Sequence, residues 1–151
     1  MMEFKEISKY ADLFDIWTAL SVAYTPPLYE KIPNFEAYVM KINEYGHSIA
    51  CYIDGSIGGC ISFYSNDLIG HNAYITQIAT HPNYQGKGIA SALLGKALSF
   101  SKRAGMTNIR LEVKKTNIHA QCFYRNHNFR FESENQDSFY MIRELKKIGE
   151  K

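Results

Sequence analysis

The spacing of apolar residues changes along the chain, and each spacing predicts a different element. Through the first third, apolar residues recur every three or four positions, which is the period of an amphipathic helix. A short strand over residues 3–7 comes first, Ser8 is the expected cap of one helix, and a second helix begins near Asn34. Thr25-Pro26-Pro27 separates the two helices, because proline lacks the N–H that a continuing helix needs. The two apolar faces consist of Leu13, Ile16, Trp17, Leu20 and Tyr24, and of Phe35, Tyr38, Val39 and Ile42.

From Ser48 the apolar period falls to two, which predicts strands. Asp54-Gly55 is a strong signal for a hairpin, His81-Pro82 ends the third strand of this region, and a helical period returns until Gly105. A short helix capped by Asn117 follows further on. In the strand before it, Ile109, Leu111 and Val113 alternate with Arg110, Glu112 and Lys114. The expected strands cover residues 49–53, 57–64, 73–80, 109–114, 129–131 and 138–142, and the two later helices cover residues 88–104 and 118–126.

This order, β-α-α-β-β-β-α-β-α-β-β, has antiparallel hairpins near both ends and a strand–helix–strand unit in the middle. It predicts an α/β fold in which helices pack on a mixed sheet. No repeat, low-complexity tract or linker interrupts the 151 residues, so we expect one domain over residues 1–151.

The composition is that of a globular protein and disfavours several kinds of partner. Hydrophobic residues make up 46% and charged residues 21% of the chain, which argues against disorder. A net charge of +2 is too small to predict a nucleic-acid partner, and no apolar run approaches the roughly 20 residues that span a bilayer. The first residues lack the apolar segment of a secretory signal, and the odd set Cys51, Cys60 and Cys122 favours reduced thiols. We therefore expect a cytoplasmic protein.

One segment carries the chemistry: Gln85-Gly86-Lys87-Gly88-Ile89-Ala90, which connects a strand to the following helix. Glycines let a ligand approach the backbone, and the free N–H groups of a helix start favour negative charge. Such a loop suits a pyrophosphate, and a glycine-rich turn that only starts a helix is the alternative. A Walker loop is excluded because Gly88 follows Lys87, and a dinucleotide fingerprint is disfavoured because Ser91 stands at its third glycine.

Two motifs resemble those of the GNAT family of N-acetyltransferases. The segment from Gln85 to Ala90 matches the family's central motif, Q/R-x-x-G-x-G/A, and the residues around it look like the family throughout. Further along, the second motif, N-x-x-A-x-x-[FL]-Y, is matched by Asn117, Ala120, Phe123 and Tyr124. The resemblance covers residues 48–142. It implies a centrally splayed mixed sheet flanked by helices, N-acetyltransferase activity, and acetyl-CoA as the co-substrate that leaves as coenzyme A.

The resemblance also implies a role for each matching residue. Backbone groups of Ile78 and Thr80 would bind the pantetheine arm where their strand splays from its neighbour at a bulge. Asn117 would contact the same arm. Tyr124 would protonate the departing thiolate, since its ordinary pKa of about 10 is near that of a thiol. The pyrophosphate would be held by Gln85, Gly86, Lys87, Gly88, Ile89, Ala90 and Ser91.

The general base is not assigned by this resemblance. Relatives often carry a glutamate on the strand before the loop, whereas Tyr74-Ile75-Thr76-Gln77-Ile78 holds no carboxylate. Water relayed by Thr76 and Gln77, His71, and His47 all stay open as the base.

Two smaller features lie in the second motif. Asn128 stands where relatives usually have glycine, and asparagine tolerates the left-handed backbone conformation. His119, Cys122 and His127 invite a metal interpretation, which we set aside because a fourth ligand is missing.

The acceptor is less constrained. Nothing resembles a long acidic groove for a basic peptide, so we expect a small primary amine, either an amino sugar carried on a nucleotide or a small metabolite. Acetylation of a protein N-terminus or lysine, and acyl-CoA binding without turnover, are the alternatives, and a homodimer stays open. The candidate walls of the acceptor pocket, which an ordinary helix–loop–helix explains equally well, are Tyr24, Pro26, Pro27, Tyr29 and Tyr64.

Overall fold

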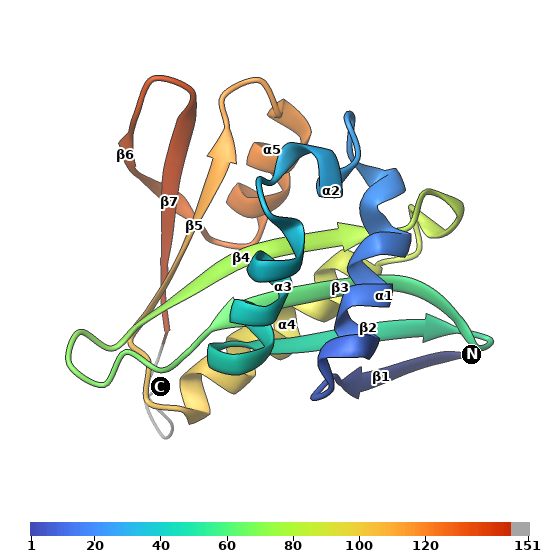
Figure 1. The fold of residues 1–151 in the computed structure, drawn as a ribbon. Helices are drawn as coiled ribbons and strands as arrows, with labels where there is room; N and C mark the ends of the chain where they lie inside the picture. The colour runs from blue at the N-terminus through green and yellow to red at the C-terminus, as the bar shows by residue number, and fades with distance from the viewer. Residues whose placement is uncertain (146–151) are drawn as a thin grey trace.

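The computed structural model describes residues 1–145, and its strands form one mixed sheet with the order β1-β2-β3-β4-β5-β7-β6 (Figure 1). The elements predicted from the apolar spacing are present, with small shifts at their ends. The strands are β1 (Met2–Glu6), β2 (His47–Ile53), β3 (Ser56–Tyr64), β4 (Asn72–Thr80), β5 (Asn108–Lys114), β6 (Arg130–Glu134) and β7 (Ser138–Glu144). The helices are α1 (Tyr10–Leu20), α2 (Leu28–Lys31), α3 (Phe35–Tyr45), α4 (Ile89–Arg103) and α5 (Ile118–Asn126).

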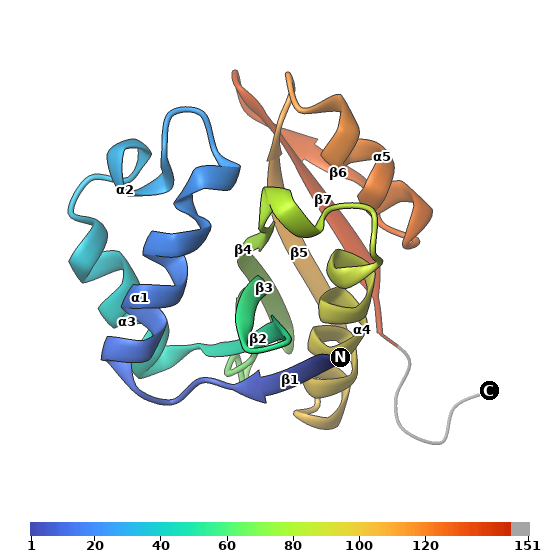
Figure 2. The ribbon, with the colours of Figure 1, turned by 90° about the vertical axis from the view of Figure 1, so that its right-hand side faces the viewer.

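Helices cover both faces of this sheet (Figure 2). α1, α2 and α3 lie on one face, and α4 and α5 lie on the other. The predicted apolar face of α1 is buried in a core between the α1–α3 layer and the sheet, and Trp17 in this core is fully buried. A larger core, which includes Phe63 of β3 and Leu93 of α4, lies under α4. The predicted α/β fold with a helix-flanked mixed sheet is therefore confirmed. None of the helices within residues 1–145 is both long and apolar enough to cross a membrane.

The N-terminal helices differ from the prediction in three details. Ser8 does not cap α1: Lys9 is the N-cap residue and makes no side-chain capping bond. α1 ends at Leu20, and a 3₁₀ turn follows, so Tyr24 lies beyond the helix in an extended conformation. The apolar spacing does not predict α2, because a helix of 4 residues is too short to show a period. The predicted start of α3 is confirmed, since Asn34 accepts the N–H of Ala37.

β4 contains one residue more than the part of β3 with which it pairs. Ile75 pairs with Phe63 and Gln77 pairs with Ser62, which leaves Thr76 without a partner. Such a bulge shifts the alternation of side chains by one position. Thr76 and Gln77 therefore both reach toward the α1–α3 layer, where each bonds to a tyrosine.

Gly59 of β3 brings the start of α4 close to the sheet. A Cβ at this position would lie 2.8 Å from the carbonyl oxygen of Ala79 and 2.8 Å from Cγ2 of Ile89. Ile89 is the first residue of α4 and is buried. The missing side chain thus lets the loop before α4 rest against the ends of β3 and β4.

Candidate active site

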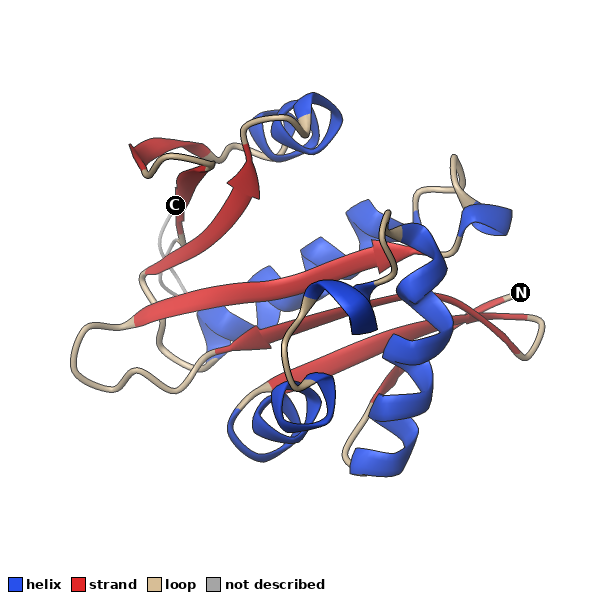
Figure 3. Ribbon diagram, turned by 45° about the horizontal axis from the view of Figure 1, so that its top comes forward, coloured by secondary structure: helices blue, strands red, loops and turns tan. Residues whose placement is uncertain are grey.

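β4 and β5 separate halfway along their length, as Figures 1 and 3 show. Their parallel pairing ends at Ile75↔Leu111, although β4 continues to Thr80. The residue after β4, His81, donates its N–H to β3 at 2.8 Å, and backbone groups alternate in direction along a strand. The N–H and C=O groups of Ile78 and Thr80 therefore face the region that β5 has left, which we call the splay. The predicted splay is confirmed.

The loop after β4 presents a helix start whose N–H groups have no side-chain cap. The φ angles of Gly86 and Gly88 are +81° and +79°, in the left-handed region that favours glycine. No neighbour lies within 4 Å of a Cβ built on either residue, so backbone conformation rather than crowding requires glycine here. Gly88 is the N-cap residue of α4, and no side chain accepts from the first turn. Open space beside unpaired N–H groups fits a pyrophosphate.

α5 approaches this loop from the second motif. At its start the Oδ1 atom of Asn117 accepts the N–H of Ala120 at 3.1 Å, so Asn117 caps the helix as predicted. Just after its end Nε2 of His127 lies 3.1 Å from the hydroxyl of Ser91, in the first turn of α4. Asn128 follows with a φ of +68°, the left-handed conformation expected from its position. The start of α4 and the end of α5 therefore lie side by side.

Tyr124 lies on α5 and is buried. Its ring packs edge-on against Phe123 and Phe129, with centroids 5.4 and 5.6 Å away. Burial raises its pKa above the ordinary value, so the hydroxyl keeps its proton at neutral pH. Burial, and after it a charge on Tyr124, raise the pKa of Tyr24. The charge effect acts between the two side chains although their helical layers lie on opposite faces of the sheet.

Two tyrosines of the α1–α3 layer bond to the splayed half of β4. The hydroxyl of Tyr24 donates to Oε1 of Gln77 at 2.8 Å and lies 3.3 Å from the carbonyl oxygen of Ile78. The hydroxyl of Tyr38 lies 2.6 Å from Oγ1 of Thr76. Both side chains close the splay on the side away from α4.

Glu112 of β5 is a carboxylate at this site that the sequence reasoning missed. In the parallel register Tyr74 lies beside Arg110, so the next residue on the same face of β5, Glu112, lies across the splay from Thr76. Tyr140 of β7 is directly opposite Glu112. Burial, then Glu112, then Tyr140, raise the pKa of Tyr74 to about 12, which places these side chains together.

The charge of Glu112 is not balanced by an ion pair within residues 1–145. Arg110, two residues before Glu112 on the same face of β5, pairs instead with Glu132, with 2.7 Å between Nε and Oε1. The strand pattern contained the signal, because Glu112 falls on the polar side of an alternating strand. Only the register with β4 shows that this side borders the splay.

The other candidate bases lie elsewhere. His47 packs against Phe63 and Phe100 on the α4 face, with 4.3 Å between the His47 and Phe100 ring centroids. His71 precedes β4, at the opposite end of the strand from the loop. Within residues 1–145, no three His, Cys, Asp or Glu side chains gather closely enough to hold a metal ion.

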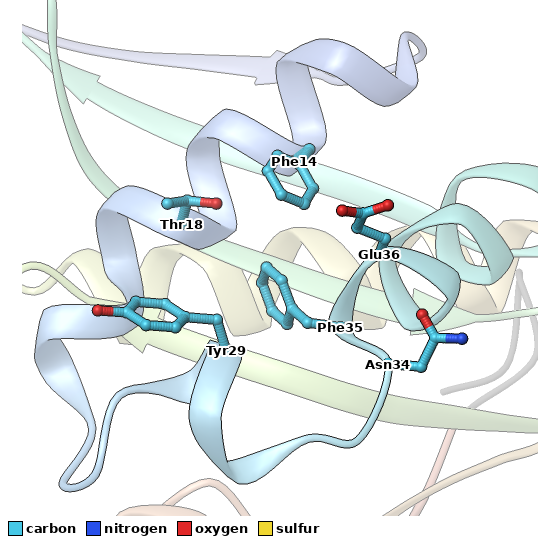
Figure 4. Close-up of a pocket in the computed structure, with 6 residues that line it drawn as sticks. All are labelled: Phe14, Thr18, Tyr29, Asn34, Phe35 and Glu36. Atoms are coloured by element: carbon cyan, nitrogen blue, oxygen red, sulfur yellow. The ribbon is translucent and has the colours of Figure 1, made fainter.

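Tyr29 does not line the splay. It borders a hollow of about 480 Å³ between α1, α2 and α3, together with Phe14 and Phe35. Figure 4 shows these side chains in front of the helices, with the strands of the sheet behind them. Of the candidate acceptor walls, Tyr24 reaches the splay. Burial, and after it a charge on Tyr38, raise the pKa of Tyr64.

Comparison with known proteins identifies the class that this fold and site define. Residues 10–129 match the model of the acetyltransferase (GNAT) family, which is more than half of the chain. The chain therefore belongs to the GNAT family.

Two curated relatives and one solved structure show what the chain is similar to. Streptothricin acetyltransferase A of Bacillus subtilis is 29% identical over 117 residues, which cover 76% of this chain and 65% of the relative. A second Bacillus subtilis protein, assigned to N-acetylation of an alanine of a ribosomal protein, is 29% identical over 55% of this chain and 53% of its own length. The chain thus spans less than two thirds of these relatives. The PaiA N-acetyltransferase of Thermoplasma acidophilum, solved with coenzyme A, has a TM-score of 0.77 at 17% identity and covers 95% of this chain and 99% of its own.

Proposed function

We propose that the protein is an N-acetyltransferase that transfers an acetyl group from acetyl-CoA to the primary amine of a small acceptor. One observation carries this proposal: the uncapped helix start at Gly88 adjoins the free edge of β4, and Glu112 lies across the splay from this edge. Acetyl-CoA would supply an acetyl group activated as a thioester.

The chain's backbone supplies most of the binding groups. N–H groups from Gly86 to Ala90 would bind the pyrophosphate, because the dipole of the 15-residue helix α4 adds to their partial charges. Gln85, Lys87 and the hydroxyl of Ser91 border the same spot, and the lysine contributes a positive charge. Ile78, Thr80 and the amide of Asn117 would bind the pantetheine arm along the splay.

Two side chains manage the protons. Glu112 would take up the proton that the attacking amine loses, directly or through one water, since a general base acts at hydrogen-bond distance. Tyr124 would donate its proton to the departing sulfur. Its raised pKa makes it a weaker acid than a free phenol, and it also ensures that the proton is present at neutral pH.

A small acceptor is supported by the splay's surroundings and by one relative. The hydroxyls of Tyr24 and Tyr38 close one side, and the Bacillus subtilis streptothricin acetyltransferase is named for a small molecule. The relative assigned to a ribosomal-protein alanine favours a protein N-terminus as the second candidate. Two of the three cysteines, Cys51 and Cys60, are buried as free thiols, which supports a cytoplasmic location.

The test has two arms. Coenzyme A should raise the melting temperature, because a ligand that binds only the native state stabilises it. Acetyl-CoA should then release a free thiol in the presence of some member of a panel of amines, amino sugars and alanine-starting peptides. Release with peptides alone would replace the small acceptor by a protein, and the absence of any melting shift at millimolar coenzyme A would reject the proposal.

A further inference from the structure

Tyr24 reaches the splay but takes no part in the proton transfers of the proposed reaction. Its hydroxyl bonds to Gln77 at 2.8 Å and approaches the carbonyl oxygen of Ile78 at 3.3 Å. That carbonyl belongs to the free edge of β4. On the outer side of the ring, the Lys31 ammonium lies 5.5 Å from the ring centroid. The phenol therefore reaches from the helical layer into the splay.

The order of residues along β4 shows which part of the splay Tyr24 occupies. A linear ligand anchored at the loop before α4 passes Thr80 first and Ile78 about 7 Å later, since a strand rises about 3.3 Å per residue. Its reacting end thus arrives at Ile78, whose carbonyl oxygen lies 3.3 Å from the hydroxyl of Tyr24. Tyr24 stands at the end of the path rather than along it.

The ring is held firmly in this position. Its hydroxyl bonds to the side chain of Gln77. Beside it, the hydroxyl of Tyr38 bonds to the side chain of Thr76 at 2.6 Å. Rotating the phenol away would break its hydrogen bond to Gln77, which lies in a partly buried environment. Packed side chains resist such displacement. An acyl chain too long for the site would have to push the ring aside, which costs free energy.

We propose that Tyr24 sets the upper limit on the acyl chain that the site accepts, admitting acetyl and rejecting longer linear acyl groups. The inference rests on the proposed function, because it takes the thioester end of acyl-CoA to lie at Ile78. Tyr24 is then a specificity-determining residue that acts through its ring volume.

The experiment measures dissociation constants by calorimetry for coenzyme A, acetyl-CoA, butanoyl-CoA and hexanoyl-CoA. The wild-type protein should bind hexanoyl-CoA about tenfold or more weakly than acetyl-CoA, the scale of an overpacking cost. Tyr24→Ala and Tyr24→Leu should bring this ratio to within about threefold of unity. Tyr24→Phe keeps the ring and should keep the ratio. The matched control is Tyr29→Ala, which removes an exposed tyrosine 5 residues away and should leave the ratio unchanged.

The outcomes separate this inference from the proposed function. If the wild-type protein binds all acyl-CoAs equally, or if folded Tyr24→Ala and Tyr24→Leu retain the wild-type ratio, Tyr24 does not set the limit. If coenzyme A itself does not bind to the wild-type protein, the proposed function fails and the inference falls with it. Circular dichroism of each variant identifies any that has lost its fold.

Discussion

Replacing Tyr124 with phenylalanine removes one hydroxyl from a well-packed ring. The ring contacts, with centroids 5.4 Å from Phe123 and 5.6 Å from Phe129, do not involve the oxygen. Burial alone raises the pKa of Tyr124, and no hydrogen bond contributes to that shift. The substitution therefore removes no hydrogen bond that would stabilise the phenolate. We therefore expect the free energy of unfolding to change by less than about 1 kcal/mol, and the affinity for coenzyme A to stay nearly constant.

Turnover should respond very differently. If Tyr124 protonates the departing sulfur, kcat should fall by about 100-fold or more, the usual scale of a general acid, while KM changes little. Any alkaline limb of the wild-type rate profile that reports this phenol should lie above pH ~10, because burial raises the pKa from its ordinary value of about 10. That limb should disappear in Tyr124→Phe.

Thiol release from acetyl-CoA, measured between pH 7 and the alkaline limit of folding, provides the assay. Calorimetry with coenzyme A supplies the control for cofactor binding. A folded Tyr124→Phe enzyme with near-normal kcat would refute the role of Tyr124, which would then be a core tyrosine.

Three further predictions concern the loop, the sheet and alkaline stability. Gly88→Val should abolish the melting shift caused by coenzyme A in a folded protein, because a φ of +79° costs an L-residue about 1–2 kcal/mol and the helix start must rearrange; an unchanged shift would make the glycine purely structural. Gly59→Ala should lower the free energy of unfolding by about 1–3 kcal/mol in urea titrations, since the new Cβ would lie 2.8 Å from the Ala79 oxygen. The control Gly95→Ala, with open space around its Cβ, should be neutral or stabilising by about 0.5–1 kcal/mol. Burial raises the folded-state pKa of Tyr24 and Tyr124, so the native state binds more protons than the unfolded state above pH ~10. The free energy of unfolding should therefore fall there by up to about 1.4 kcal/mol per pH unit for each tyrosine. A melting temperature that is flat from pH 9 to 11 would contradict this.

Local signals in the sequence predicted the fold and the backbone conformation of the glycine loop well. The left-handed conformations at Gly86, Gly88 and Asn128 and the cap at Asn117 follow from residue type and immediate neighbours. The Ser8 cap was wrong because Lys9, one residue later, takes the N-cap position although it has no side-chain acceptor.

The acceptor side of the site depends on contacts between distant segments. Tyr24 and Gln77 are separated by 53 residues, and no local pattern pairs them. Glu112 is found only from the register between β4 and β5, which sequence periodicity does not determine. The sequence therefore predicted the shape of the glycine loop more fully than the surroundings of Tyr24 and Glu112.

The extra residue at Thr76 gives one strand two independent halves. Upstream of Thr76, packing constrains the side chains of β4, because Ala73 and Ile75 are buried under α4. Downstream, the amides of Ile78 and Thr80 face away from β3 and into the splay. A deletion of Thr76 would restore the regular alternation, so that Gln77 alone would face the α1–α3 layer where both residues do now, and Tyr38 would lose its partner Thr76. Changes of chain length should thus be far better tolerated in the surface loops than at this single position.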